Sequence, residues 1–195
     1  DNISNRDLVF IKRLTKVLHH ILDEDPQLSS TDLNKSYDYC LQGIEKIKAG
    51  ETNGYSINNV LTMQAHFHAY AGNFAETAYR RTNSSRLGSK AYDHRIKAGQ
   101  LVEETEPAYA AYVYGLAVNV CWALAKTSRG VIWHRRAVDC YTKFLNYFDF
   151  HRDKFKREGA ASRLALNARS GLELLPRIVA AEDRRNGLLQ RRIVS

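Results

Sequence analysis

Proline and cysteine are both scarce in this chain of 195 residues, and their scarcity limits the folds that it can adopt. Only 3 prolines occur, and most of the 11 glycines lie where an apolar periodicity stops, a pattern typical of long helices joined by short turns. The 3 cysteines, Cys40, Cys121 and Cys140, form no CxxC pair, so the sequence indicates neither a zinc knuckle nor a disulfide framework. We expect free thiols in a reducing compartment and therefore a cytoplasmic location.

Several motifs that mark catalytic or cofactor sites are also missing. The chain has no GxxxxGK[ST], GxGxxG or GxSxG motif, which argues against the classical nucleotide-binding and hydrolase folds. His66 and His68 are two residues apart. On a helix they would point about 200° apart, whereas a helical pair of metal ligands needs a spacing of three or four residues. We therefore expect no metal and no cofactor.

Apolar residues recur at steps of three and four along almost the whole chain, and no segment alternates convincingly with a period of two. This periodicity predicts helices throughout, beginning with one over 5–23 and one over 32–49. Breaks between helices are expected at 50–54, at Gly72-Asn73, at 82–85, at 127–130 and at Pro176. We therefore predict a single all-α domain over 1–195, an array or bundle of about eight to nine antiparallel helices.

One stretch raises the question of a membrane. Residues 107–125 carry no charge over 19 positions, which is near the length needed to cross a bilayer. The stretch consists mostly of Ala, Tyr and Val and contains Gly115 and Asn119, a weakly apolar composition for lipid. A helix that is apolar on all sides can also lie in a protein core. We favour a buried central helix and expect no membrane partner.

The net charge of +8 is unevenly distributed along the chain. Residues 1–106 hold 13 Lys/Arg and 14 Asp/Glu, a net charge of −1, whereas residues 107–195 hold 16 and 7, a net charge of +9. Such asymmetry favours a nucleic acid, an anionic membrane or an acidic protein as partner. The alternative is a solvated arginine-rich surface that serves solubility.

The basic residues fall into series that could bind phosphate or carboxylate groups. Aromatic residues near them could stack on bases, namely Tyr79, Tyr92, Trp133 and Tyr147. The alternative is that these tyrosines make core and inter-helix contacts. The candidate binding residues are Arg80, Arg81, Arg86, Lys90, Arg95, Lys97, Arg129, Trp133, Arg135, Arg136, Arg152, Lys154, Lys156 and Arg157. Further arginines follow at Arg163, Arg184, Arg185, Arg191 and Arg192. The alternative is that each arginine caps a helix or pairs with a carboxylate of a neighbouring helix.

Two segments, 69–81 and 121–145, resemble tetratricopeptide-type repeats, in which a short turn with small residues separates two antiparallel helices. In the first segment the sequence is AYAGNFAETAYRR, and 72–74 match the Gly-Asn-aromatic turn. Two positions depart from the pattern, because Thr77 stands where the family has alanine and Arg81 where it has an aromatic residue. The resemblance covers about half of the chain and implies a superhelical interaction scaffold.

A second resemblance concerns Arg129 and His134, which lie in the segment RGVIWH. Arg-x4–6-His resembles the catalytic motif of HEPN-type helical ribonucleases, and Arg13 with His19 has a similar spacing. The resemblance implies metal-independent RNA cleavage, in which the histidine transfers protons and the arginine stabilises phosphoryl charge. In that family the motif is carried by a helix, whereas Arg129 falls in a predicted turn.

Three functions are therefore expected, in this order. The first is a non-catalytic helical scaffold or binding module that engages an acidic protein or a nucleic acid. The second is a basic helical subunit that binds RNA or DNA along the phosphate backbone. The third is a HEPN-like ribonuclease. The identity of the partner, the oligomeric state and the choice between an open superhelix and a closed bundle stay open.

Overall fold

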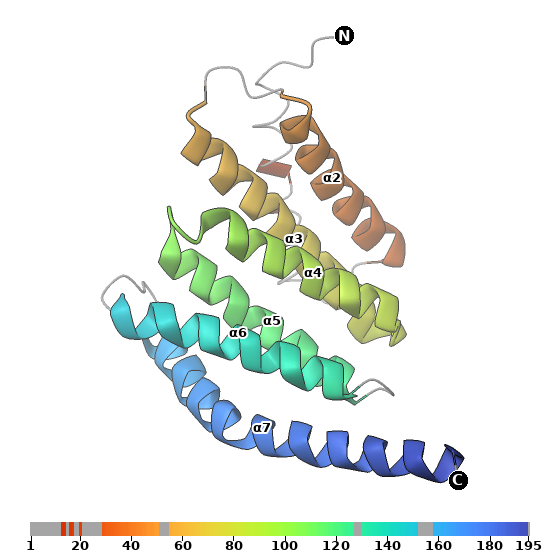
Figure 1. Ribbon diagram of the computed structural model, residues 1–195. Coiled ribbons are helices and arrows are strands. Elements are labelled where there is room, and N and C mark those ends of the chain that lie inside the picture. The colour runs from red at the N-terminus through yellow and green to blue at the C-terminus, as the bar shows by residue number, and fades with distance from the viewer. Residues whose placement is uncertain are drawn as a thin grey trace. The chain divides into compact units, whose positions relative to one another are not determined.

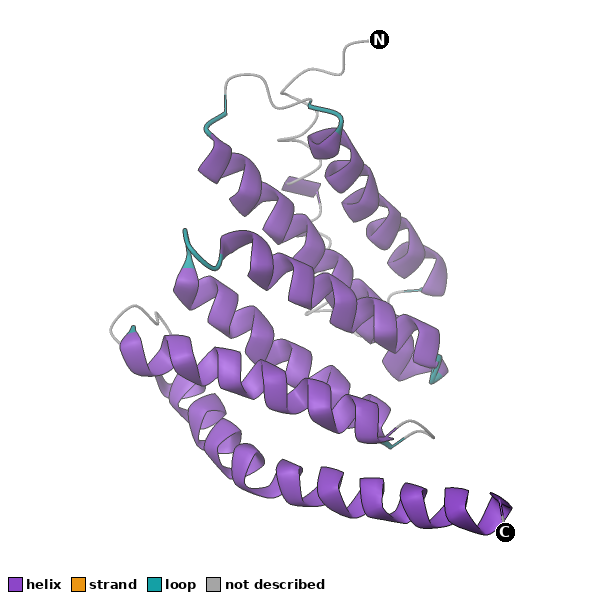
Figure 2. Ribbon diagram, in the orientation of Figure 1, coloured by secondary structure: helices purple, strands orange, loops and turns teal. Residues whose placement is uncertain are grey.

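The computed structural model describes residues 13–14, 16–17, 20, 29–50, 55–126, 130–151 and 158–194, and of 158–161 and 187–194 it describes the backbone alone. These residues contain no strand, which confirms the prediction of an all-α chain (Figures 1 and 2). The helices are α2 (Ser30–Lys48), α3 (Ile57–Thr82), α4 (Ser85–Val102), α5 (Pro107–Ala125), α6 (Gly130–Phe150) and α7 (Glu158–Val194). Most of the helix predicted over 5–23 lies outside the described residues.

The prediction of eight to nine helices is wrong for the part of the chain that the structure describes, which has these six. One expected break does not occur because α3 continues through Gly72-Asn73. Gly72 instead allows α4 to approach closely. A Cβ atom at this position would lie 3.0 Å from Cγ of Arg95 and 3.2 Å from the carbonyl oxygen of Ala91. The glycine is therefore required by helix packing and forms no turn.

The break expected at Pro176 is also absent, because α7 runs through this residue. A proline inside a helix removes one backbone hydrogen bond and crowds the preceding turn, which bends the helix. Figure 1 shows α7 curving along its length. Burial of Ala168 and Leu175 on one side of α7 holds the helix together, because tertiary packing outweighs local propensity. The tail helix expected after Pro176 is thus part of α7.

The break expected at 82–85 is confirmed, because α3 ends at Thr82 and α4 begins at Ser85. Of the breaks expected at 50–54 and 127–130, residues 51–54 and 127–129 lie outside the described residues, and Gly130 is the first residue of α6. Ser29 and Ser56 cap α2 and α3, since each hydroxyl accepts a backbone N–H three residues later, at 3.1 and 3.3 Å. Asn83 ends α3 in the left-handed conformation, with φ of 54°. Only two residues, 83 and 84, therefore connect α3 to α4.

The chain divides into two compact units, residues 1–113 and 114–195, and the boundary falls within α5. The prediction of one domain over 1–195 stays a prediction.

In unit 1, α2 packs on α3 and α3 packs on α4. Leu33, near the start of α2, shares an apolar cluster with Phe74, whereas Ile47, near the end of α2, shares another with Met63. The two helices are therefore antiparallel. The α3–α4 pair is antiparallel too, because Glu76 late in α3 contacts the middle of α4, whereas earlier in α3 the Thr62 hydroxyl donates to Glu106 beyond the end of α4.

In unit 2, the later part of α5 packs on α6, and α6 packs on α7. Trp122 Nε1 donates to the Tyr141 hydroxyl at 3.2 Å, and Lys143 Nζ donates to the Tyr114 hydroxyl at 3.4 Å, so α5 and α6 run antiparallel. A hydrogen bond with Cys140, together with burial, raises the pKa of the Cys121 thiol. All three cysteines of the chain are free and buried.

Helix α5 is the one helix among the described residues that is long and apolar enough to cross a membrane by length and composition. Residues such as Ala110, Tyr114, Val118 and Cys121 are fully buried, and 56% of the most apolar window is buried. A helix in a protein core passes the same test of length and composition. The expected buried helix and the expected cytoplasmic location stay predictions.

The contact between Gly43 of α2 and Phe67 of α3 leads to a test of the α2–α3 packing. A Cβ atom at position 43 would lie 2.6 Å from the Phe67 ring, which is fully buried, so the ring or the two helices would have to shift. We expect Gly43→Ala to lower the free energy of unfolding by about 1–3 kcal/mol, as overpacking does, although alanine is the better helix former. Urea unfolding followed by circular dichroism measures the change.

Two further variants complete this test. Gln42→Ala, at the exposed neighbouring position, should change the stability little. In a Phe67→Leu background the cost of Gly43→Ala should shrink, because the smaller side chain makes room for the methyl group. A Gly43→Ala protein as stable as the original would show that α2 does not lie against Phe67.

Candidate binding surface

The division of charge in the sequence coincides with the boundary between the two units. Residues 107–113 carry no charge, so unit 1 (1–113) holds 13 Lys/Arg and 14 Asp/Glu, a net charge of −1. Unit 2 (114–195) holds 16 Lys/Arg and 7 Asp/Glu, a net charge of +9. All of the excess positive charge therefore belongs to one compact unit, and an acidic partner would be attracted to that unit.

The first basic series lies at the end of α3 and along α4 of unit 1. Arg80 and Arg81 are exposed in the last turn of α3, where positive charge also complements the helix dipole. Arg86 and Lys97 are exposed on α4, and half-buried Lys90 places its ammonium group 5.2 Å from the centre of the Tyr37 ring. Spacings of four and seven residues put the three α4 cations on one side of this helix.

Arg95, predicted to be a binding residue of the same series, lies in the core and is only 4% exposed. Its guanidinium Nη2 contacts Glu76 Oε2 and donates to Asn73 Oδ1 at 3.0 Å. Burial lowers the pKa of Arg95, and the charge of Glu76 opposes this shift. Glu76 also accepts from Arg80 Nη2 at 2.7 Å. The register of α4 turns Arg95 toward α3, so it is not available at the surface.

The two histidines of the H-x-H stretch contact different neighbours, in agreement with the helical geometry. The His66 ring meets Tyr109 edge-on, with ring centroids 5.1 Å apart. His68 Nδ1 lies 2.9 Å from Nδ1 of His94, whose Nε2 lies 2.9 Å from the Tyr37 hydroxyl. This contact between α3 and α4 could not be predicted from sequence spacing, because His94 is 26 residues away from His68.

Both histidines of this pair are neutral at ordinary pH. Burial, assisted by the charges of His94, Lys97 and Lys48, lowers the pKa of His68 to about 3. Burial and the charge of Lys90 lower the pKa of His94 to about 4.

In the part of the chain that the structure describes, no group of three or more His, Cys, Asp or Glu residues could hold a metal ion.

At the start of α6, the basic residues and the tryptophan have separate roles. Trp133 is buried, because it belongs to the stripe that faces the core of unit 2, and the guanidinium of Arg136 lies 4.5 Å from the centre of its ring. Arg135 is exposed and donates to Asp183 of α7 at 2.6 Å. His134 Nδ1 lies 3.1 Å from Glu182 Oε2. The buried Trp133 therefore offers no exposed ring for a base.

Five predicted binding residues lie outside the described residues. They are Arg129, Arg152, Lys154, Lys156 and Arg157.

Helix α7 carries a surface that the sequence reasoning recognised only in part. Its inner side, with Ala165, Ala168 and Leu175, is buried. Exposed residues spaced by three or four lie on the opposite side. We call this side the outer face of α7; it consists of Arg163, Leu166, Ser170, Glu173, Leu174, Arg177, Ala181, Arg184 and Arg185. The sequence analysis named Arg163, Arg184 and Arg185 as basic residues. Their spacing relative to the apolar stripe of the same helix could have predicted that they share an exposed face with Leu166 and Arg177.

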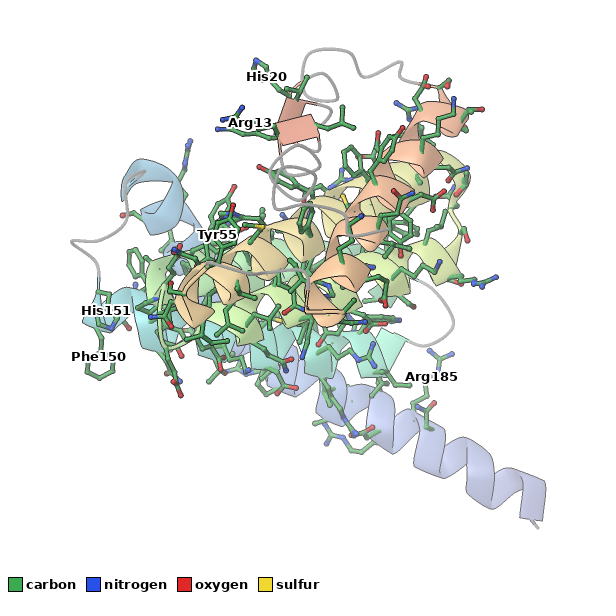
Figure 3. All side chains as sticks on the ribbon, turned by 90° about the horizontal axis from the view of Figure 1, so that it is seen from above. Arg13, His20, Tyr55, Phe150, His151 and Arg185 are labelled. Carbon is green, nitrogen blue, oxygen red and sulfur yellow. The ribbon has the colours of Figure 1, made fainter. Side chains whose placement is uncertain are left out.

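The remaining charges of the α6–α7 pair are largely engaged with one another. Arg169 of α7 donates to Asp149 of α6 at 2.5 Å. Of the outer face, Arg184 Nε donates to the carbonyl oxygen of Ala180 at 3.1 Å. Arg177 and Arg185 form no ion pair with a described residue, and Figure 3 shows Arg185 projecting from α7. These arginines could meet the charge of a partner without breaking an internal pair.

Comparison with known proteins gives no match: no protein-family model, no curated protein and no solved structure is significantly similar to the chain.

The burial of Arg95 leads to a prediction about stability. Glu76→Gln removes the charge that compensates the buried guanidinium while it preserves the shape of the side chain. We expect the free energy of unfolding to fall by about 3–5 kcal/mol, as when one partner of a buried ion pair is lost. Chemical denaturation measures the change.

The matched control for this variant is Arg80→Ala, which removes the second cation on Glu76. The Arg80 side chain is 66% exposed, so its loss should cost less than about 1 kcal/mol. If Glu76→Gln and Arg80→Ala lower the free energy of unfolding equally, the buried ion pair of Arg95 with Glu76 does not stabilise the fold as proposed.

The histidine pair predicts a dependence of stability on pH. The pKa values of about 3 and about 4 lie below the ordinary value of 6.5, so the unfolded chain binds more protons than the folded chain between these limits. The stabilisation from the pair is thus complete above pH 6.5 and is lost as the pH falls toward the folded pKa values. We expect two of the 7 histidine rings to remain neutral down to about pH 5, so that their chemical shifts in proton NMR stay constant to that pH.

The variants His68→Gln and His94→Gln would assign these two signals. The prediction fails if every histidine signal of the folded protein titrates between pH 6 and 7.

Proposed function

We propose that the chain is a non-catalytic helical binding module whose unit 2 engages an acidic partner. The observation that carries this proposal is the net charge of +9 on residues 114–195, beside a net charge of −1 on residues 1–113. Because the imbalance follows a boundary of the structure, it is a property of one compact body. Charge on one body attracts an oppositely charged partner and also selects against basic ones.

The internal ion pairs of unit 2 support this proposal. Asp149, Glu182 and Asp183 are acids of unit 2 that already contact a basic residue of the same unit. They are therefore occupied in holding α6 against α7. The arginines of the outer face of α7 are exposed, and a partner that brings carboxylates or phosphates would neutralise them.

A ribonuclease function has less support from the geometry of the described residues. His134, the general base that the HEPN-like motif would need, is buried and lies 3.1 Å from Glu182 Oε2. Its ring also meets Trp122, with centroids 5.6 Å apart. A histidine in this environment holds α7 on α6. Arg129, the other half of the motif, lies outside the described residues.

Helix-pair organisation of the tetratricopeptide type remains part of the proposal in a coarser form. Antiparallel neighbours within each unit support it, whereas the continuity of α3 through 72–74 removes the turn on which the first match relied. The buried cysteines suit the proposed cytoplasmic location, because free thiols persist in a reducing compartment.

The proposal is tested with the full chain and fluorescein-labelled polyglutamate, by fluorescence anisotropy. We expect binding at low salt that weakens steeply as sodium chloride is added, since salt screens exposed charges. Arg191→Glu/Arg192→Glu changes the charge of unit 2 by −4 and should weaken binding roughly tenfold, which corresponds to about 1.4 kcal/mol.

The matched control makes the same change of charge in unit 1. Arg86→Glu/Lys97→Glu replaces two exposed cations and should weaken binding much less, because unit 1 is not the proposed binding body. If the chain binds no polyglutamate at low salt, or if the two double variants behave alike, the proposal is wrong.

A further inference from the structure

The outer face of α7 contains two large apolar side chains among its arginines. Leu166 is 65% exposed and Leu174 is 52% exposed. They lie eight residues apart, so they are about 80° apart around the helix and about 12 Å apart along it, within the outer face. A single exposed leucine is ordinary on a protein surface, but two leucines on one basic helix face offer two apolar contacts of defined spacing.

This face is not needed for the packing of unit 2. The opposite side of α7 already supplies the buried residues, and Gly171 allows close packing against the Tyr141 ring, since a Cβ atom there would lie 2.4 Å from it. Glu182 and Asp183 contact residues of α6. The outer face therefore keeps its leucines and arginines at the surface.

The charge on this face has one predominant sign. Arg163, Arg177, Arg184 and Arg185 are exposed there, and Glu173 is the one acid. The arginines lie on both sides of the leucines along the helix. Such a face presents a short apolar centre between cationic ends. A complementary surface must carry apolar side chains in its middle and carboxylates or phosphates toward its ends.

A nucleic acid matches only half of this description. Its phosphates would neutralise the arginines, but its bases stack on aromatic rings, and the outer face has none. Of the aromatic residues near basic groups in the sequence, Trp133 and Tyr79 are buried, and Tyr92 and Tyr147 are half-buried on α4 and α6. An anionic membrane needs a broader apolar face than two leucines separated by Ser170. A protein helix can supply aliphatic side chains and carboxylates together.

We infer that the outer face of α7 docks an acidic amphipathic helix of a partner protein. The inference rests on the proposed function and specifies its surface and its partner. In the complex, apolar side chains of the partner cover Leu166 and Leu174, and its carboxylates pair with Arg163, Arg177 and Arg184. Arginine suits this role because its planar guanidinium holds a carboxylate through two hydrogen bonds.

The experiment measures binding of the full chain to a fluorescein-labelled synthetic helix. The peptide has leucines on one face, glutamates beside them and alanines elsewhere, and anisotropy reports its binding. We expect Leu166→Ser/Leu174→Ser to weaken peptide binding by about tenfold or more, because the apolar contact is lost. The same variant should bind polyglutamate as the original protein does, because no charge has changed.

The control is Ile132→Ser/Phe150→Ser, which removes two apolar side chains of α6 that are 48% and 82% exposed. Figure 3 shows Phe150 next to His151, projecting from the end of α6. This variant should bind the peptide as the original protein does. Circular dichroism should show unchanged helix content in both variants, because all four side chains are exposed.

Each other outcome has a definite meaning. If the two double variants bind the peptide equally, the proposed docking surface is wrong, and retained polyglutamate binding still supports the proposed function. If the original protein binds neither the peptide nor polyglutamate, the docking surface and the proposed function are both wrong. Tighter binding of single-stranded RNA or of anionic phospholipid vesicles than of the peptide would overturn the partner class in favour of the tighter binder.

Discussion

The buried ion pair between Glu76 and Arg95 fixes how α3 and α4 of unit 1 meet. A guanidinium that is 4% exposed must remain beside its carboxylate, because an uncompensated charge in the core costs several kcal/mol. The pair therefore permits one register between the two helices. Gly72 makes the register possible, since a side chain there would press on Arg95. Once Arg95 points inward, the periodicity of α4 turns Lys97 outward.

In unit 2 the contacts between α6 and α7 have a comparable effect on the surface. Contacts of His134 with Glu182, of Arg135 with Asp183 and of Asp149 with Arg169 hold the two helices together along their length. They also engage three acids of a unit whose net charge is +9. The interactions that stabilise the helix pair thus leave the opposite side of α7 positively charged, so the fold and the proposed binding surface have a common origin.

The periodicity of apolar residues was sufficient to predict the helical class and most helix ends, because burial of one stripe decides where a helix forms. It was insufficient at Gly72 and Pro176, whose local preference for a break is outweighed by packing against another helix. Side-chain roles were harder to predict. Arg95 and Trp133 belong to basic stretches of sequence, yet they face the core, and the charge series alone contains no information about which side of a helix each residue occupies.

Because all three cysteines are buried, the reactivity of their thiols depends on local opening of the fold. A thiol must be exposed before an alkylating reagent or an oxidant can reach it, so its modification rate measures how often the surrounding helices separate. Cys40 lies in unit 1, whereas Cys121 and Cys140 lie in unit 2. The modification rates of these three thiols therefore measure the opening rates of the two units separately in a single sample, with no prior labelling of the protein.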